Sequence, residues 1–300
     1  MFDSAPIIPQ TRPLLQSPAF FRALTAAGQR PRRLSDDTLL TTRRLPGGLR
    51  LYQIPRSGTD PLALPDLVAE AGLTRRGFVI SPDRPTPQLR RIGAIRVARS
   101  PGAIELPLDG DLSAGLDGLW RHRLAHARDQ EVTVKRSNLP MDPGHWIFGS
   151  NTPRRTRSQR LPASVLTLAY AAANPGDAKL FTAHIGQTRI AAMLFLLHDD
   201  GATWHMFRST PHGHIRAAHY LLMWSAMTWL ADNRYARLDL GPVTGPAPYT
   251  ASFRMGTGAL VRPLGDVWAW WPPLHRVSAP TRRMDPKNPE QSGPGLPSAP

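Results

Sequence analysis

The clearest hydrophobic pattern lies between residues 202 and 259, where it predicts a strand, a helix, a second strand and a glycine-rich loop. Residues 203–209 are aromatic-rich and of strand length, and a Pro-His-Gly turn follows them. Over residues 215–232 apolar side chains recur every three or four positions, which predicts one buried helix face. Residues 236–240 then form a short apolar run before a Gly-Pro pair. We expect this second strand to lie parallel to the first, with ligands bound at the carboxyl ends of both.

The same patterns predict further elements on both sides of residue 110. The first group comprises a helix from Pro18 to a stop at Gly28, an antiparallel hairpin over 38–43 and 49–54, a helix over 62–72, and strands over 77–81, 92–98 and 103–108. The second comprises helices over 113–130 and 162–173, strands over 131–136, 179–185 and 189–197, and one or two final strands over 259–271. In the helix over 113–130 we expect Leu119 on the buried side. Together these elements predict an α/β (α+β) fold.

The chain of 300 residues carries a formal net charge of +15 and contains no cysteine. The lack of cysteine excludes disulfides, thiolate nucleophiles and cysteine-ligated zinc. The charge favours a polyanionic partner such as a tRNA, a CoA nucleotide or an anionic membrane surface. A compositional origin is the alternative, because arginine, proline and alanine are abundant together, as in proteins from GC-rich genomes.

The sequence predicts neither a secretory signal nor a membrane span. Residues 1–10 lack a basic region followed by an apolar one. The most apolar window, residues 217–231, is too short to cross a bilayer. Beyond residue 274, proline, serine and glycine without apolar periodicity predict a disordered tail. We therefore expect a soluble cytoplasmic protein.

The turn before the long predicted helix has the composition of a phosphate cradle. Gly213 allows the backbone to pass close to a ligand. The first amides of the helix, on His214, Ile215, Arg216 and Ala217, should lack intrahelical partners and lie at the positive end of the helix dipole. A phosphate would bind there, with the Arg216 side chain as a counter-charge.

Histidines concentrate in this part of the chain, since six of the ten lie between His184 and His219. Their spacing forms no recognisable metal-ligand motif, so we expect no metal and interpret them as packed or solvated side chains. His205 and His219 are nevertheless candidate acid–base groups, because imidazole titrates near neutral pH.

Three motifs carry a resemblance to a known family: a helix with Leu221, Leu222 and Trp224, then Leu238-Asp239-Leu240-Gly241, then Phe253-Arg254-x-Gly-x-Gly-Ala. In this order they resemble the Fem-type branch of the GNAT acyltransferase superfamily, which includes the aminoacyl transferases that build peptidoglycan cross-bridges. The chain departs from the typical pattern at two positions. Arg254 stands in place of a lysine, and Thr257 in place of an aromatic residue.

The resemblance implies a GNAT-like mixed sheet flanked by helices, in two tandem lobes of which the first is degenerate. We therefore divide the chain into an N-terminal arm over residues 1–13, a degenerate lobe over 14–130, an acyltransferase lobe over 131–274 and a proline-rich tail over 275–300. The GNAT phosphate loop is represented loosely by residues 208–218, which adds Arg208 to the donor-binding candidates.

The resemblance also implies transfer of an acyl or aminoacyl group to an amine. The donor would be acyl-CoA, bound as a co-substrate, or aminoacyl-tRNA, and the acceptor a small molecule or a peptidoglycan-precursor-like amine. By position, Arg254 takes the role of the lysine that contacts the donor, and Tyr249 lies in the same loop; an ordinary solvent-exposed arginine is the alternative. Asp239 at a strand end would orient or deprotonate the acceptor, or else cap a turn as a structural carboxylate.

A function of another class is a non-catalytic basic module that keeps the fold and binds RNA or another polyanion. Salt-dependent nucleic-acid binding without an effect of CoA esters would distinguish it from a transferase. A third possibility is a structural partner in an envelope or lipid-modifying assembly.

Overall fold

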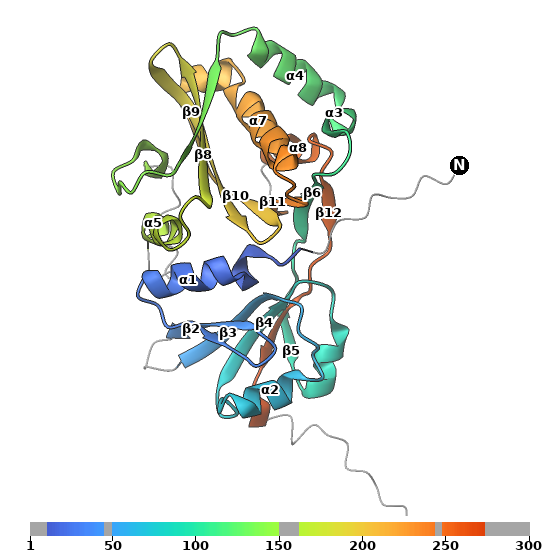
Figure 1. Cartoon of the computed structure of the whole chain (residues 1–300). Helices are drawn as coiled ribbons and strands as arrows, with labels where there is room; N and C mark the ends of the chain where they lie inside the picture. The colour runs from blue at the N-terminus through green and yellow to red at the C-terminus, as the bar shows by residue number, and fades with distance from the viewer. Residues whose placement is uncertain (1–10, 45–49, 150–161, 244–247, 274–300) are drawn as a thin grey trace, which may run out of the picture.

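The computed structural model describes residues 11–44, 50–149, 162–243 and 248–273, which form two mixed β-sheets stacked end to end (Figure 1). The first sheet contains β1 (Arg32–Arg33), β2 (Leu39–Arg44), β3 (Arg50–Ser57), β4 (Gly77–Pro82), β13 (Val267–Trp270) and β5 (Ile95–Ala98), in that spatial order. The second contains β12 (Leu260–Arg262), β6 (Ala103–Pro107), β11 (Arg237–Pro242), β10 (Gly201–Ser209), β9 (Thr188–His198), β8 (Ala178–Ile185) and β7 (Thr133–Asn138). The predicted α/β class, with mixed sheets flanked by helices, is confirmed.

Helices and short 3₁₀ turns cover these sheets. The helices are α1 (Pro18–Ala26), α2 (Leu64–Glu70), α3 (Leu112–Gly115), α4 (Gly118–Arg128), α5 (Ala163–Ala173), α6 (Pro211–Ile215), α7 (Ala218–Asp232) and α8 (Pro248–Met255), and the 3₁₀ turns are Leu14–Gln16, Pro87–Ile92 and Trp146–Phe148. α4 and α7 share a hydrophobic core with one face of the second sheet, and α1 and α5 with the other. α2 packs on the first sheet around Val68 and Phe78.

The two predicted pairings that matter most are present. β2 and β3 form the antiparallel hairpin. β10 and β11 lie parallel, with α7 as the crossover between them. The strands β8, β9 and β10 form the antiparallel meander that precedes this crossover.

Two long helices predicted from periodicity are each interrupted. Asp117 accepts a hydrogen bond from the amide of Trp120 at 2.6 Å, so it caps a new helix, α4, and separates it from α3. Leu119, expected on the buried side, is 60% exposed because this new start changes the helix phase. In the second case Ala217 takes a left-handed backbone with φ of 49°, which ends α6 and lets α7 begin at Ala218.

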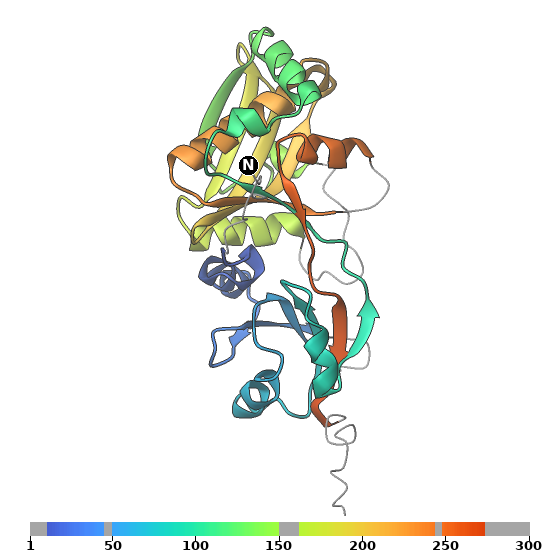
Figure 2. The same ribbon diagram turned by 90° about the vertical axis from the view of Figure 1, so that its right-hand side faces the viewer.

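The division of the strands between the two sheets does not follow the lobe limits expected at residues 130 and 274. β6 pairs with β11 and β12 in the second sheet, and α4 packs on the core of that sheet. β13 joins the first sheet, where Trp270 lies 5.3 Å from Phe78 between ring centres and donates to the carbonyl of Ile92 at 2.8 Å. Figure 2 shows the chain passing from β12 down to β13, so it crosses between the sheets twice.

The ends of the chain fall mostly outside the described residues. Within the predicted N-terminal arm, Thr11 and Pro13 are buried, and the carbonyl of Thr11 accepts a hydrogen bond from Arg237 at 3.0 Å. This part of the arm is therefore packed at the junction of the sheets. The predicted tail over residues 275–300 lies outside the described residues.

Candidate functional site

The strands β10 and β11 pair only at their beginnings. Their parallel register runs from Gly201 opposite Arg237 to Thr203 opposite Asp239 and goes no further. Beyond that point β10 follows β9, with a bulge between Trp204 and Met206. β11 follows β6, with a bulge after Asp239. The two strands therefore part at their carboxyl ends, where ligands bind in parallel sheets. We call this opening the strand split.

Arg254 crosses the strand split from α8. Its guanidinium carbon lies 5.3 Å from the centre of a Trp204 ring on β10. Its Nη1 donates to the carbonyl of Pro242 on β11 at 3.0 Å. Among the described residues, the Nε of Arg254 and the Nε1 of Trp204 are buried without a hydrogen-bond partner. These two N–H groups therefore lack the hydrogen bond that a buried donor ordinarily makes.

Aromatic rings line the α7 side of the split. Phe253 lies 6.0 Å from Trp204 and 5.3 Å from His219 between ring centres. Its carbonyl accepts a hydrogen bond from the indole of Trp120 at 3.0 Å. Phe207 on β10 lies 6.0 Å from His219. This packing holds the last turn of α8, and so the position of Arg254, on the hydrophobic core of the lobe.

His219 lies inside this aromatic cluster with 5% of its surface exposed. Burial, together with the neighbouring His214 and Arg123, lowers its pKa to about 4. The imidazole is therefore neutral near pH 7 and a weak base. The acid–base role expected for His219 finds no support in this environment.

His205 is not brought into the split. The Nε2 of His205 shares a hydrogen bond with the hydroxyl of Thr167 on α5, at 2.7 Å. Since α5 covers the opposite face of the sheet from α7, His205 points away from His219. Tyr249 falls in the first turn of α8, and its side chain lies outside the described residues.

The predicted phosphate cradle is largely engaged in its own turn. The amides of His214, Arg216 and Ala217 donate to backbone carbonyls within residues 210–217. Glycine is needed at position 213 for packing, and not for the close approach of a ligand. A Cβ there would lie 2.4 Å from the carbonyl oxygen of Ile190, so the turn packs directly on β9. The expectation of free amides on these three residues is wrong, because α6 is a separate helical turn.

The remaining donor candidates lie apart. Ile215 is largely exposed at the end of α6. Arg208 donates to the carbonyl of Trp146, and its guanidinium carbon lies 4.6 Å from the Trp146 ring centre. It therefore anchors the 3₁₀ turn Trp146–Phe148 on β10 instead of facing the cradle.

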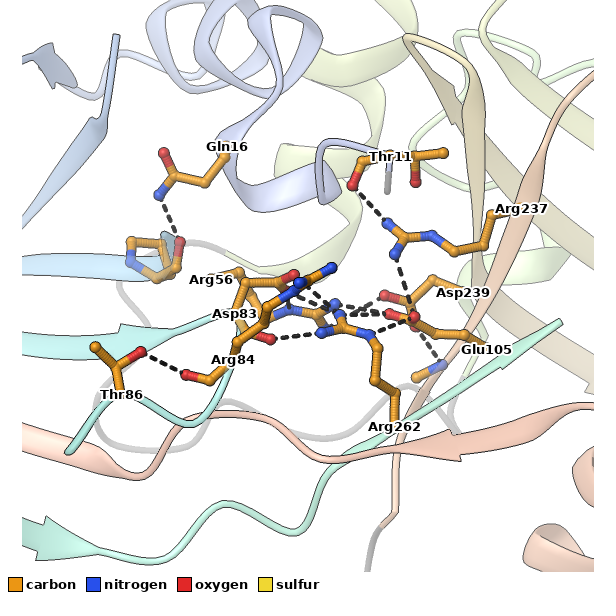
Figure 3. A network of polar contacts seen from close by, with 12 residues as sticks. Thr11, Gln16, Arg56, Asp83, Arg84, Thr86, Glu105, Arg237, Asp239 and Arg262 are labelled. Atoms are coloured by element: carbon orange, nitrogen blue, oxygen red, sulfur yellow. Dashed lines mark hydrogen bonds and ion pairs between the residues drawn. The ribbon is translucent and has the colours of Figure 1, made fainter. Parts of the chain in front are cut away.

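A second polar centre lies where the two sheets meet, and we call it the junction network (Figure 3). It joins three carboxylates and three guanidinium groups: Asp83, Glu105, Asp239, Arg56, Arg237 and Arg262. Arg56 and Asp83 belong to the first sheet or its loops, whereas Glu105, Arg237 and Asp239 belong to the second. Equal numbers of opposite charges allow such a group to be buried.

Glu105 is the centre of this network and is fully buried. Its carboxylate accepts from Arg262 at 2.7 and 2.9 Å, from Arg56 at 2.9 Å and from Arg237 at 3.1 Å. Burial alone would raise the pKa of Glu105, but the hydrogen bond of Arg262 and the charges of all three arginines hold it below its usual value. Glu105 is therefore a carboxylate at neutral pH.

Asp239 is the member of the network that reaches the strand split. It is 8% exposed, and its Oδ1 accepts from the amide of Gly241 at 2.7 Å across the bulge. Its Oδ2 lies 3.4 Å from Nη1 of Arg56. Burial raises the pKa of Asp239 despite the opposing charge of Arg56 and the Gly241 hydrogen bond. The turn-capping alternative is thus present in the structure, at the last residue of β11 that pairs with β10.

A cavity of about 800 Å³ opens beside the junction network. Arg56, Arg237 and Arg262 form part of its wall. The rest comes from polar segments of the first sheet and of the N-terminal loop, including Arg12, Asp36, Asp37, Thr38, Asp60 and Arg84. Its size suits a small polar molecule or the reactive end of a larger one.

Sequence reasoning selected Asp239 and Arg254 but missed Arg56, Glu105, Arg237 and Arg262. The sequence did contain a signal for two of these four residues. Glu105 and Arg237 each interrupt an apolar strand, and fully buried charges are found in proteins only when they are paired. No comparable signal marks Arg56, because its partners lie at least 27 residues away.

The described residues contain neither a metal-ligand cluster nor a membrane-spanning helix. In the part of the chain that the structure describes, no three His, Asp or Glu side chains are grouped so as to hold a metal ion. Among the helices of the described residues, none is long and apolar enough to cross a membrane.

Known proteins with a similar sequence pattern or a similar structure have the same type of fold. Residues 121–250 match the family model described as an acetyltransferase (GNAT) domain. No curated protein matches the sequence significantly.

Among solved structures, the crystal structure of FemX is similar with a TM-score of 0.68 and 13% identity, covering 89% of this chain and 94% of FemX. A conserved protein of unknown function from Bacteroides thetaiotaomicron gives 0.57 at 10% identity, covering 85% of this chain and 90% of its own. L-PGS from Bacillus licheniformis gives 0.54 at 12% identity, covering 85% and 89%. The resemblance to the Fem-type branch is confirmed at the level of the fold.

Proposed function

Because the chain carries a GNAT acetyltransferase domain within a two-lobe fold like that of FemX, we propose that it is an N-acyltransferase. The acyl or aminoacyl group would be transferred from a donor in the strand split to an amine acceptor held in the cavity of the junction network. The fold alone does not fix chemistry, so the proposal rests on the residues at these two places.

The observation that carries the proposal is the pair of unpartnered donors at the split. Arg254 Nε and Trp204 Nε1 are buried within the described residues beside strands that have just parted. A thioester or ester carbonyl, or a phosphate oxygen, would supply the acceptors they lack. Acyl-CoA is the donor we favour, because the aromatic lining suits an acyl chain; aminoacyl-tRNA is the alternative donor.

The cavity supports a polar acceptor. Asp36 and Asp60 carry carboxylates that would attract an ammonium group, and Arg84 would attract an acidic group on the same molecule. A peptidoglycan-precursor-like amine, which the family resemblance implies, has both kinds of group. A small amine would fit the same volume.

In the reaction, the bound ammonium group first releases one proton to solvent, and the neutral amine nitrogen then attacks the donor carbonyl carbon and a C–N bond forms. The C–S bond of a thioester, or the C–O bond of an aminoacyl ester, breaks. The amine must lose a proton, and Asp239 is the carboxylate at the split that can accept it and return it to the leaving group. Arg254 and Trp204 would donate to the oxygen that becomes negative in the transition state.

The direct test is a thermal-shift titration of the whole chain with acetyl-CoA, longer acyl-CoAs, free CoA and bulk tRNA at two salt concentrations. We expect a saturable rise of Tm with a CoA ester that persists at the higher salt concentration. Transfer to amine mixtures would then be followed by release of free CoA. No shift with any CoA ester or charged tRNA would contradict the proposal.

One observation favours a second function. The cradle amides of His214, Arg216 and Ala217 are already bonded, which is the state expected of a fold that no longer binds a donor phosphate there. A basic module binding RNA or another polyanion would show a Tm rise with tRNA alone that fades as salt increases. Equal response to charged and uncharged tRNA would identify this function.

A further inference from the structure

Arg56 occupies a backbone conformation that its side chain does not favour. Its φ is 50°, in the left-handed region, and it lies at the bulge between Pro55 and Ser57 where β3 leaves its register with β4. Bulges change the direction of a side chain at the end of a strand. Strained residues of this kind concentrate at functional sites.

The result is a side chain that leaves the first sheet and enters the second. Arg56 Nε lies 2.5 Å from Asp83, Nη2 lies 2.9 Å from Glu105, and Nη1 lies 3.4 Å from Asp239. The same residue forms part of the cavity wall. Figure 3 shows its guanidinium among the carboxylates of both sheets. Arg56 therefore touches both the cavity and the aspartate at the split.

We propose that Arg56 is a positioning residue for Asp239, which it keeps ionised and oriented at the point where β10 and β11 part. This inference rests on the proposed function, in which Asp239 accepts the proton of the amine. It adds a first-lobe residue to Asp239, Arg254 and Trp204, the groups proposed to act on the reacting atoms, which all come from the second lobe.

The arrangement of charges around Asp239 explains why Arg56 would be the residue that keeps it ionised. Four groups face the carboxylate: Arg56 from β3, Glu105 from β6, Arg237 on its own strand and Arg254 from α8. Arg237 donates to Glu105 and Thr11, and Arg254 donates to Pro242. Among the ion pairs of the described residues, Asp239 pairs with Arg56. Without Arg56, the nearby Glu105 would favour a protonated Asp239.

The first experiment measures the charge of Asp239 without any turnover. Carboxyl ¹³C NMR of the full chain, with the Asp239 signal assigned from Asp239→Asn, gives its titration midpoint. We expect Arg56→Gln to raise this midpoint by at least about one pH unit, and Arg56→Lys to raise it less because the charge is kept. Arg12→Gln, which removes an exposed arginine paired with Asp37, should leave it unchanged. An unchanged midpoint in Arg56→Gln overturns the inference.

The second experiment separates positioning from stability. The acidic limb of the pH profile of kcat should move upward in Arg56→Gln by the same amount as the titration midpoint, with KM for the donor unchanged. If Arg56→Gln does not fold, Arg56→Lys carries both measurements. A moved midpoint with an unmoved profile overturns the catalytic part. Should the wild type transfer nothing, the proposed function fails, while the titration still decides whether Arg56 controls Asp239.

Discussion

The guanidinium of Arg254 lies over the Trp204 indole, 5.3 Å from a ring centre, and together they close the opening between two parallel strands. Arg254 comes from α8 and Trp204 from β10, which are 50 positions apart in the sequence. Each contributes one N–H donor that is buried without a partner in the described residues. The pair is therefore the feature of the strand split that most directly implies a ligand.

Arg254→Ala should lower kcat/KM for transfer by about 100-fold, because it removes a donor from the developing oxyanion. The Tm of the free protein should change little, since the variant loses one hydrogen bond to Pro242 and one contact with the Trp204 ring. Arg254→Lys should retain part of the activity through its charge. The measurement is release of free CoA under first-order conditions.

The matched control for this prediction is Arg128→Ala. Arg128 also lies over an indole of the same lobe, 5.8 Å from a Trp224 ring centre, but on α4 and away from the split. Its removal should leave kcat/KM unchanged. Equal losses in the two variants would show that the effect of Arg254 is on folding and not on transfer.

Local patterns predicted the elements well, and the reason is physical. The parallel β10 and β11 pair and the hairpin of β2 and β3 follow from apolar periods and turn residues that act over a few positions. The same information selected Asp239 and Arg254, since both stand at element ends. Local information could not place β13 in the first sheet, because that choice depends on contact of Trp270 with Phe78 about 190 positions earlier.

The pairing of residues within the junction network could not be predicted from the sequence for the same reason. Arg262 meets Glu105 across 157 positions, and Arg56 meets Asp239 across 183. The predicted phosphate cradle is the reverse case, in which the sequence indicated a site that the structure does not show. Composition around Gly213 indicated a ligand, whereas the glycine is required by the close approach of α6 to Ile190. A glycine in a turn can serve either the approach of a ligand or the close packing of two elements, so only the observed packing distinguishes these two roles.

Glu105→Gln should destabilise the fold by about 3–5 kcal/mol, because it leaves three guanidinium groups facing a neutral side chain in a buried network. Urea unfolding followed by circular dichroism measures this loss. Asp37→Asn is the control, since its pairs with Arg12 and Arg33 are exposed and should be worth about 1 kcal/mol or less. A Glu105 variant as stable as the Asp37 variant would argue against the network as a junction between the sheets.

Gly213→Ala should destabilise by about 1–3 kcal/mol, since the new methyl group would meet Ile190 and Ser209 at 2.4 and 2.5 Å. Gly118→Ala provides the comparison. It stands in the first turn of α4 with no atom within 4 Å of the new Cβ, so stability should stay equal or rise by about 0.5 kcal/mol. Thermal unfolding of both variants decides. A neutral Gly213→Ala would reopen the ligand interpretation of this glycine.

The pH dependence of stability should carry the signature of His219. Its pKa is about 4 in the folded protein against an ordinary value of 6.5, so the unfolded chain binds a proton first as pH falls. The stabilisation is fully present above about pH 6.5 and decreases between about pH 6.5 and 4, by at most about 3 kcal/mol. His219→Phe should remove this decrease.

His198 has a similar pKa and the raised pKa of Asp239 acts in the opposite direction, but both remain in the variant and cancel in the difference. Urea unfolding of both proteins at about pH 7 and about pH 4.5 gives that difference. An identical pH dependence in the two proteins would mean that His219 is solvated and free to titrate, and it would restore His219 as an acid–base candidate.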